Sequence, residues 1–315
     1  MNVRLKLIAA DQGGVFSRRQ ALASGYTPDQ IVAYLRDGRW ERIRRGQYAE
    51  PADISQLEPW QRAGWIHRRK IHAAMNSLRS GSVAVSHQSA LVLHGLPTWA
   101  LDLSRVHVSR IEGRSGGTVA DVQHHLGRLA LEDLTVVDGR VVTTAGRAVV
   151  ETACATSFEA AVVGVDAALR AGGLSAEDMR RLVELTAFWP GSANARAALR
   201  FGDRLCESVG ESRMRVFLYE QGFPAPVLQA EFRDRQGFIG RVDFYFPEYR
   251  LVLEFDGLLK YGGGEAVVLI GEKRREDRLR ALGLTVVRSV WSDLDHPARL
   301  AATLRDQFAA ARRTA

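Results

Sequence analysis

One short segment near the C-terminus alternates apolar and charged residues, and it constrains the fold more than any other part of the chain. Residues 239–246 and 250–256 have the two-residue period of β-strands, and Pro247–Arg250 is compatible with a turn. The sequence therefore predicts a β-hairpin in which Phe246 pairs with Leu251. Its apolar face should form a core with the side chains of Val242, Phe244, Phe246, Leu251, Leu253 and Phe255.

The other face of this hairpin gathers charges. The expected register places Asp243 opposite Glu254 and Arg241 opposite Asp256. Two like charges that oppose each other on neighbouring strands destabilise the pair by up to about 1 kcal/mol. A bridging divalent cation would reverse that effect, because magnesium binds carboxylate oxygens. The alternative is that Arg241 neutralises Asp256 while the other carboxylates face solvent.

The elements around the hairpin follow a defined order. A helix containing Glu211 and a strand near 227–232 come before it, and a basic helix over 271–282 and a strand over 284–289 come after it. With these elements, the span 211–294 resembles the very-short-patch-repair-like branch of the PD-(D/E)xK nuclease superfamily. The resemblance is carried by Gly210-Glu211-Ser212-Arg213, Gln229, Arg241-Val242-Asp243-Phe244, Leu253-Glu254-Phe255-Asp256-Gly257, Lys260-Tyr261, Lys273-Arg274-Arg275-Glu276-Asp277-Arg278-Leu279 and Val286-Val287-Arg288.

This resemblance implies a restriction-endonuclease-like mixed sheet flanked by helices and a metal-dependent endodeoxyribonuclease activity. Asp243 and Glu254 match the family's metal-binding acids and would hold Mg²⁺ or Mn²⁺, which lowers the pKa of a bound water and stabilises charge on the phosphate. Asp256 stands where the superfamily usually has Lys. Lys260 or Lys273 would then supply the missing catalytic cation.

Simpler roles remain open for several of these residues. Glu211 supports the metal or its water in the family pattern, but it also fits a capping box in which it accepts from the amide of Ser208. Lys273 and Asp277 are also spaced for an ion pair on an exposed helix. From the same basic helix, we expect Arg274 and Arg278 to contact DNA.

The N-terminal part predicts a second DNA-binding element. Two short helices, opening at Ser17 and Thr27 around a glycine turn, suggest a helix-turn-helix, and Gly38–Ala49 alternates like a hairpin wing. The block 14–50 resembles the winged-helix domain of type IV abortive-infection (AbiEi-like) antitoxins, which implies DNA contacts. The alternative is a winged helix that binds protein. The expected phosphate-contacting residues are Arg18, Arg19, Arg36, Arg39, Arg42, Arg44 and Arg45.

The middle of the chain predicts an α/β region to which the sequence assigns no chemistry. Residues 136–142 form an Asp-Gly hairpin pattern, and alanine-rich helices are expected over 146–155, 157–171, 175–186 and 194–207. The histidine pairs His67/His72 and His124/His125 lack a metal-ligand spacing, so we expect packing or surface roles, and His87 should belong to a helix cap.

Chain length, cysteine number and net charge indicate the domain organisation, the compartment and the partner. The 315 residues are enough for an α+β multidomain chain, which we divide into 1–55 (winged helix), 56–200 (α/β connecting domain) and 201–315 (nuclease-like domain). Cys154 and Cys206 are too few for a disulfide framework, and no segment resembles a signal peptide or a membrane span, so a cytoplasmic protein is expected. A net charge of +7 suits DNA as the partner.

Two functions follow from these observations. The first is a metal-dependent endonuclease whose DNA is positioned by the winged helix. The second is a non-catalytic, antitoxin-type transcriptional regulator whose nuclease-like domain has lost its chemistry. The sequence leaves the oligomeric state open, a homodimer included.

Overall fold

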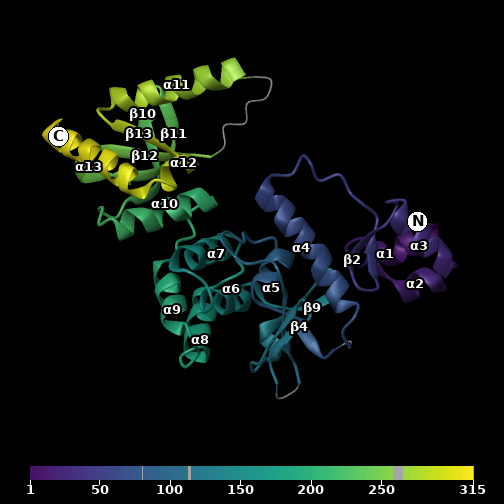
Figure 1. Ribbon diagram of the computed structural model, residues 1–315. Coiled ribbons are helices and arrows are strands. Elements are labelled where there is room, and N and C mark those ends of the chain that lie inside the picture. The colour runs from purple at the N-terminus through teal and green to yellow at the C-terminus, as the bar shows by residue number, and fades with distance from the viewer. Residues whose placement is uncertain (80, 113–114, 258–264, 315) are drawn as a thin grey trace. The chain divides into compact units, whose positions relative to one another are not determined.

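The computed structural model describes residues 1–79, 81–112, 115–257 and 265–314, and Figure 1 shows its helices and strands. The chain folds as two compact units, Met1–Phe201 and Gly202–Ala315, here called the N-terminal and C-terminal units. Three separate sheets, flanked by helices, confirm the predicted α+β multidomain class.

The first part of the N-terminal unit is a winged helix. Ser17 and Thr27 cap its second and third helices, each in a capping box with a glutamine three residues on, as the sequence predicts. Its strands form an antiparallel sheet in the order β1-β3-β2. The elements are α1 (Val3–Ala10), β1 (Val15–Ser17), α2 (Arg18–Ala23), α3 (Pro28–Arg36), β2 (Glu41–Arg44) and β3 (Gln47–Ala49).

An aromatic cluster holds this small domain together. Trp40 is 2% exposed and lies at the start of the wing. The rings of Phe16 and Tyr34 pack edge-on against it, with centroids at 4.7 and 5.0 Å. Aromatic rings bury large areas, so a few of them can give so short a segment a core of its own.

The second part of the N-terminal unit is a mixed six-stranded sheet in the order β6-β7-β5-β4-β9-β8. The predicted Asp-Gly hairpin is confirmed, because Asp138 and Gly139 both have positive φ, the backbone of a type I′ turn. The strands are β4 (Val83–Val85), β5 (Val106–Arg110), β6 (Gly117–Val119), β7 (Val122–His125), β8 (Leu134–Val137) and β9 (Arg140–Thr143).

Helices complete this part. The predicted alanine-rich helices are present, but the last one ends at Phe201 and not at Glu207, because residues 202–208 lead into the next unit. The helices are α4 (Pro59–Met75), α5 (His87–Leu93), α6 (Ala145–Ala153), α7 (Phe158–Arg170), α8 (Ala176–Leu185) and α9 (Ser192–Phe201), with a 3₁₀ turn at Leu131–Asp133.

The C-terminal unit is a four-stranded sheet in the order β10-β11-β12-β13, in which only the β12–β13 pair is parallel. A crossover through α11 joins these two strands (Figure 1). The elements are α10 (Val209–Glu220), β10 (Val227–Asp234), β11 (Gly237–Phe246), β12 (Leu251–Asp256), α11 (Glu265–Ala281), β13 (Thr285–Val290), α12 (Trp291–Leu294) and α13 (Pro297–Thr314), with a 3₁₀ turn at Pro247–Tyr249.

Both faces of this sheet are covered. One face packs against α10 and α13 through a cluster that includes Met214, Phe246 and Leu304. The other face packs against α11 through a cluster that includes Val252 and Leu279. The charges of the hairpin therefore lie on a face that a helix covers, where they are partly removed from water.

The predicted hairpin is confirmed, with two corrections. Phe246 pairs with Leu251 as expected, but backbone pairing of the two strands ends at Phe244 and Leu253, so Asp243 and Glu254 are not direct ladder partners. The backbone N–H of Phe255 donates to the Asp243 side chain instead. Val242 was assigned to the same core as Phe244, but it packs in the cluster beneath α11.

A close contact between α10 and β12 gives a test of this packing. A Cβ atom at Gly210 would lie 2.0 Å from Cε1 of Phe255, so Gly210→Ala forces the ring to move. We expect a loss of about 1–3 kcal/mol in the free energy of unfolding, measured by chemical denaturation. The control is Gly271→Ala on α11, where nothing lies within 4 Å of the new Cβ. This variant should be neutral or stabilised by up to about 1 kcal/mol, and equal effects of the two substitutions would contradict the packing.

Candidate DNA-binding surface and carboxylate pocket

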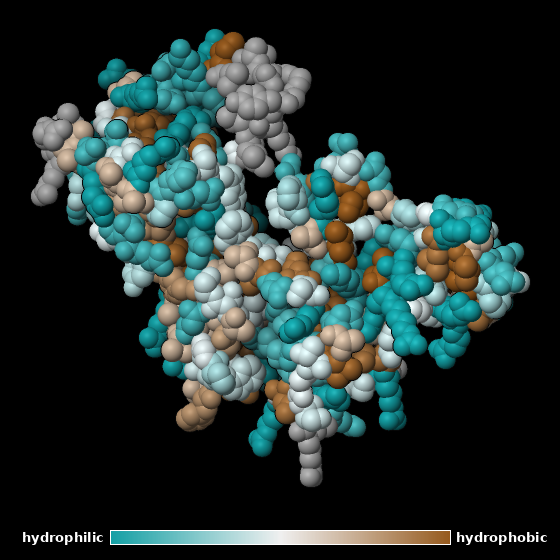
Figure 2. All heavy atoms as spheres, viewed as in Figure 1, coloured by the Kyte–Doolittle hydropathy of each residue, from teal (hydrophilic) through white to brown (hydrophobic). Residues whose placement is uncertain are grey.

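Exposed arginines border the helices and the wing of the winged helix. Arg18 and Arg19 open α2, Arg36 ends α3, and Arg42 and Arg45 lie on the wing. Figure 2 shows mostly hydrophilic residues on the visible face of this part, around a small apolar group. Such a surface is suited to phosphate contacts.

Three of the predicted contact residues already have partners within the chain. Arg36 Nε lies 3.2 Å from Asp37 Oδ1, and its side chain stays largely exposed. Arg39 pairs with Asp37 and lies over the ring of Tyr34, 3.6 Å from its centroid, and its side chain stays half exposed. Arg44 forms a 2.7 Å ion pair with Asp121, and its side chain is only 18% exposed. Arg39 therefore remains accessible at the surface, whereas the ion pair of Arg44 within the N-terminal unit limits its availability to DNA.

The charged residues of the hairpin line one pocket in the C-terminal unit. The pocket has a volume of about 420 Å³. Four of its residues are the charged residues of the hairpin that were expected from the sequence, and α11 contributes two more. The lining residues are Gly240, Arg241, Asp243, Glu254, Asp256, Glu272 and Arg275.

Asp243 is held by two hydrogen bonds. Its Oδ2 accepts from the backbone N–H of Phe255 at 2.9 Å, and its Oδ1 accepts a long bond from Gln229 Nε2 at 3.4 Å. Burial raises the pKa of this carboxyl, and the hydrogen bonds offset only part of that effect. A charged Asp243 thus lacks a close positive partner among the described residues.

Glu254 is the most deeply buried carboxylate of the pocket, at 5% exposure. Its Oε1 accepts from Arg275 at 2.6 Å, but its buried Oε2 has no hydrogen bond and lies 3.6 Å from the Arg288 guanidinium. Burial raises the pKa of Glu254 despite Arg275. Part of this carboxylate is therefore unsatisfied.

Arg288 neutralises the remaining carboxylates. It pairs with Asp256 at 3.0 Å and with Glu272 and Glu276 at 3.2 Å each. The expected pairing of Arg241 with Asp256 is wrong, because Arg241 binds Glu207 at 2.6 Å. The alternative in which Arg241 neutralises Asp256 and the other carboxylates face solvent is therefore wrong in both parts, because Arg288 pairs with Asp256 and Glu254 is buried.

Glu211 combines a capping role with a link to Asp243. Ser208 caps α10 by accepting from the Glu211 N–H, but the Glu211 side chain accepts from the amide of Glu207 and not from that of Ser208. Gln229 Nε2 donates to the same Glu211 oxygen at 2.9 Å and also reaches Asp243. Burial raises the pKa of Glu211 as well.

Of the two lysines expected to supply a cation, only Lys273 belongs to the part of the chain that the structure describes. Lys260 lies outside the described residues, and Lys273 is exposed on α11 and does not line the pocket. The expected ion pair of Lys273 with Asp277 is not formed in the described part of the chain. Arg274 is exposed, whereas Arg278 forms a two-pronged ion pair with Asp234 at 2.6 and 2.8 Å, which limits its availability to DNA.

Four residues of the site went unassigned in the sequence analysis: Gln229, Glu272, Arg275 and Arg288. A signal in the sequence exists for two of them. Glu272 and Arg275 are three residues apart and so share one face of a helix. Arg288 is the parallel-strand partner of Glu254, which only the β12–β13 pairing reveals.

The histidine pairs behave as expected in packing. His67 is buried and bonded to Ser89 Oγ and to the carbonyl of Leu103, and His72 is fully buried beside Asp138. His124 and His125 point to opposite faces of β7, and His124 is buried. His125 and His87 have other neighbours, which are described below.

The fold and its surfaces define a protein with a winged-helix domain that exposes several arginines and a second compact unit that carries a carboxylate pocket. Among the described residues, no helix has the length and apolar character needed to cross a bilayer.

Comparisons with known proteins agree with the first of these domains. Residues 3–51 match a family described as a transcriptional regulator, AbiEi antitoxin. Two proteins of Mycobacterium tuberculosis, from strains CDC 1551 and H37Rv and both named uncharacterized, are 27% identical over 281 residues, covering 88% of this chain and 96% of theirs. The N-terminal domain is thus similar to that of antitoxin regulators, and the similarity to the mycobacterial proteins reaches into the C-terminal unit.

The raised pKa of Asp243 gives a pH-dependent prediction. A carboxyl whose pKa is higher in the folded state than in the unfolded state lowers stability as the pH rises through the folded pKa. Asp243→Asn removes this charge and should raise the free energy of unfolding at pH 8 by about 1 kcal/mol per unit of pKa increase. The difference should vanish as the pH falls below the unfolded-state value of 3.8.

Denaturation at several pH values measures this effect, with no metal added. Asp277→Asn on the exposed face of α11 is the matched control and should change stability little at any pH. If Asp243→Asn is less stable than the wild type at pH 8, the buried charge is compensated by a contact that the amide cannot replace.

Proposed function

We propose that this protein binds duplex DNA through its winged helix and hydrolyses phosphodiester bonds at the carboxylate pocket with a bound divalent cation. The observation that carries the proposal is a pair of incompletely compensated carboxylates, the buried Glu254 and the partly buried Asp243. The DNA-binding half is also supported by the match of residues 3–51 to the family of regulators.

The winged helix supplies affinity and position. In such domains one helix enters the major groove while the wing contacts the backbone. Here α3 packs through buried Ile31 and leaves Val32 and Arg36 exposed, and Arg42 and Arg45 extend from the wing. The contacts that such arginines make to phosphates are largely independent of the DNA sequence.

The pocket fits a hard divalent cation by the chemistry of its donors. The buried Oε2 of Glu254 has no hydrogen bond, and Asp243 Oδ1 accepts only at 3.4 Å. Carboxylate oxygens are the preferred ligands of Mg²⁺ and Mn²⁺, so Asp243 and Glu254 would hold the ion. When bound, it would activate a water and stabilise negative charge on the phosphate.

The chain's own residues supply the rest of the site. Gln229 bridges Glu211 and Asp243 and thereby fixes the orientation of the Asp243 carboxylate. Arg275 and Arg288 stand in for the lysine that Asp256 replaces, because a guanidinium can donate two hydrogen bonds to one phosphate. Arg275 must release Glu254 before it can do so.

A second function is favoured by a specific observation. Arg275 pairs with Glu254 and Arg288 pairs with Asp256, as expected of a domain that keeps its fold and has lost its chemistry. The protein would then act as a non-catalytic regulator that binds an operator, in line with the description of the matched family.

DNA binding can be tested on the wing. Arg45→Gln removes an exposed positive charge, so the slope of log affinity against log salt should decrease by about 0.9, the value for one phosphate contact on B-DNA. Fluorescence anisotropy with a labelled duplex at several salt concentrations measures the slope. Arg170→Gln, an exposed arginine on α7, is the control and should leave the slope unchanged. Equal slopes for the wild type, Arg45→Gln and Arg170→Gln would show that Arg45 does not contact DNA.

Cleavage can be tested with metal and with Asp243. The wild type should cut DNA with Mn²⁺ or Mg²⁺, and Asp243→Asn should lower the rate by about 100-fold or more while DNA affinity is kept. Asp277→Asn is the matched control. If duplex, mismatched, nicked and single-stranded DNA all stay intact with the wild type, the nuclease proposal fails. A specific site recovered by selection from random DNA would then support the regulator.

A further inference from the structure

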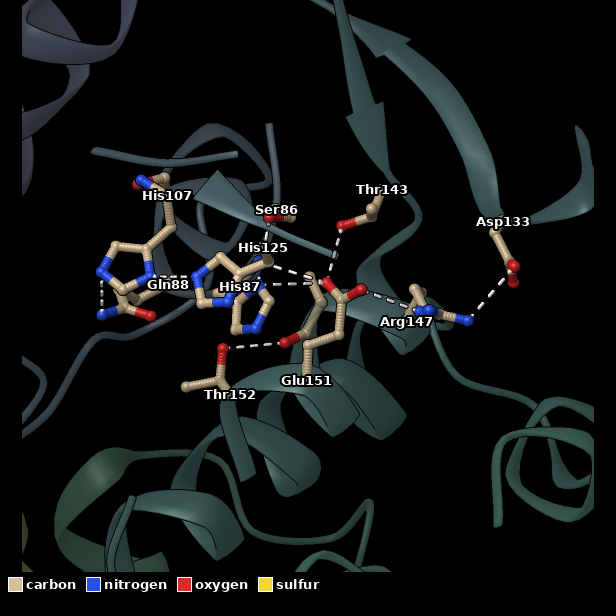
Figure 3. A network of polar contacts seen from close by, with 12 residues as sticks. Ser86, His87, Gln88, His107, His125, Asp133, Thr143, Arg147, Glu151 and Thr152 are labelled. Atoms are coloured by element: carbon tan, nitrogen blue, oxygen red, sulfur yellow. Dashed lines mark hydrogen bonds and ion pairs between the residues drawn. The ribbon is translucent and has the colours of Figure 1, made fainter. Parts of the chain in front are cut away.

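Three histidines that are far apart in the sequence meet in the N-terminal unit. His87 begins α5, His107 lies on β5 and His125 ends β7, and Figure 3 shows their rings side by side. One ring nitrogen from each lies within 4.8 Å of the others, and this is the only group of three or more metal-ligating side chains so placed in the described parts of the chain. We propose that these three imidazoles bind a divalent transition metal ion of the zinc class.

The fold explains how the three side chains converge. In the parallel β5–β7 pair, Ser109 is the partner of His125 and His107 is the partner of Gln123, so His107 and His125 share one face of the sheet. Only Ser86 separates the end of β4 from His87, which brings the start of α5 against that face. The His87 and His125 rings stack with centroids 3.6 Å apart, and His107 Nδ1 lies 2.9 Å from His125 Nε2.

Burial favours the uncharged form of all three imidazoles. Burial lowers the pKa of His107 and of His125 to about 4 and that of His87 well below its usual value. A metal binds the unprotonated nitrogen of an uncharged imidazole, so no ring has to give up a positive charge, but each ring must carry its remaining proton on the nitrogen that faces away from the ion. Three neutral imidazoles suit zinc, copper or nickel far better than magnesium or calcium.

Polar side chains behind His87 orient its ring. His87 Nδ1 lies 3.0 Å from Ser86 Oγ and 3.6 Å from the carboxylate of Glu151, which is itself held by buried Arg147 (Figure 3). A carboxylate behind a histidine is the usual support of a metal-binding ring, because it fixes the proton on the far nitrogen. Here it would leave His87 Nε2 free for the ion.

The competing arrangement is a hydrogen-bonded chain without metal. Gln88 Nε2 lies 2.9 Å from His107 Nε2 and also donates to the carbonyl of Asp102, so His107 would carry its proton on Nδ1 and donate it to His125. Metal binding at His107 Nδ1 requires the Gln88 amide to turn over and accept from Nε2. The two arrangements therefore make opposite predictions about binding.

The test is a titration of the full-length protein, free of any histidine tag, with Zn²⁺, followed by calorimetry, and with Co²⁺, followed by its visible absorption. We expect one tight site per chain and the intense absorption of four-coordinate Co²⁺, since three protein ligands leave one position for water. His125→Gln and, separately, His107→Gln should weaken Zn²⁺ binding by about tenfold or more. His87 is left unchanged because its φ of 52° lies in the left-handed region, where a substitution could alter the backbone as well as remove the ligand.

Two control variants separate this site from others. His296→Gln changes an exposed histidine of the C-terminal unit, and Asp243→Asn changes the carboxylate pocket, so both should keep the tight Zn²⁺ site. Circular dichroism of each variant establishes that it is folded. If the folded wild type binds no Zn²⁺ tightly, or if His107→Gln and His125→Gln bind it as well as the wild type, the hydrogen-bonded chain is correct and the proposal is wrong. Neither result bears on DNA cleavage.

Discussion

The cost of burying a carboxylate controls the chemistry of the C-terminal unit. Glu254 lies on a strand whose two faces are both covered, so its charge must be matched by a positive group or lost by protonation. Arg275 from α11 and Arg288 from β13 provide that charge in this structure. The position of α11 over the sheet and the parallel β12–β13 pairing are thus tied to one electrostatic requirement.

The same requirement operates in the N-terminal unit. Arg147 is fully buried and bridges Asp133 and Glu151, at 3.2 and 2.9 Å. Glu151 in turn accepts from the backbone N–H of His87 and lies beside its ring. A buried pair of this kind adds little net stability, but removing one partner is costly. The network therefore fixes the start of α5, and with it one of the three clustered histidines.

Local sequence patterns were sufficient to predict the elements and much of their pairing. The capping boxes at Ser17 and Thr27, the turn at Asp138-Gly139 and the register of Phe246 with Leu251 depend on residues close together in the chain. Periodicity fails where a strand irregularity intervenes. Gln229 has a positive φ, and backbone pairing stops beside Asp243, so alternation placed Val242 in the wrong core.

The sites needed long-range information. Arg288 reaches Glu254 only because β13 pairs with β12 in parallel, and no spacing in the sequence encodes that choice. The histidines show the same limit. The rule that His124 and His125 point to opposite faces is correct, but it excluded only a site made by those two residues. The partners of His125 are 18 and 38 residues earlier in the chain, on other elements.

Arg275 links the two proposed functions of the pocket. In its present position it partly satisfies Glu254 and so competes with a cation for the same carboxylate. A phosphate of bound DNA would offer the guanidinium a second anionic partner of suitable geometry. If DNA draws Arg275 away, Glu254 loses its counterion, and its affinity for a divalent cation must rise. By linkage, the cation must then favour DNA to the same extent. An arginine in the pocket is therefore compatible with a nuclease that assembles its metal site on DNA, and equally with a regulator in which the exchange no longer occurs.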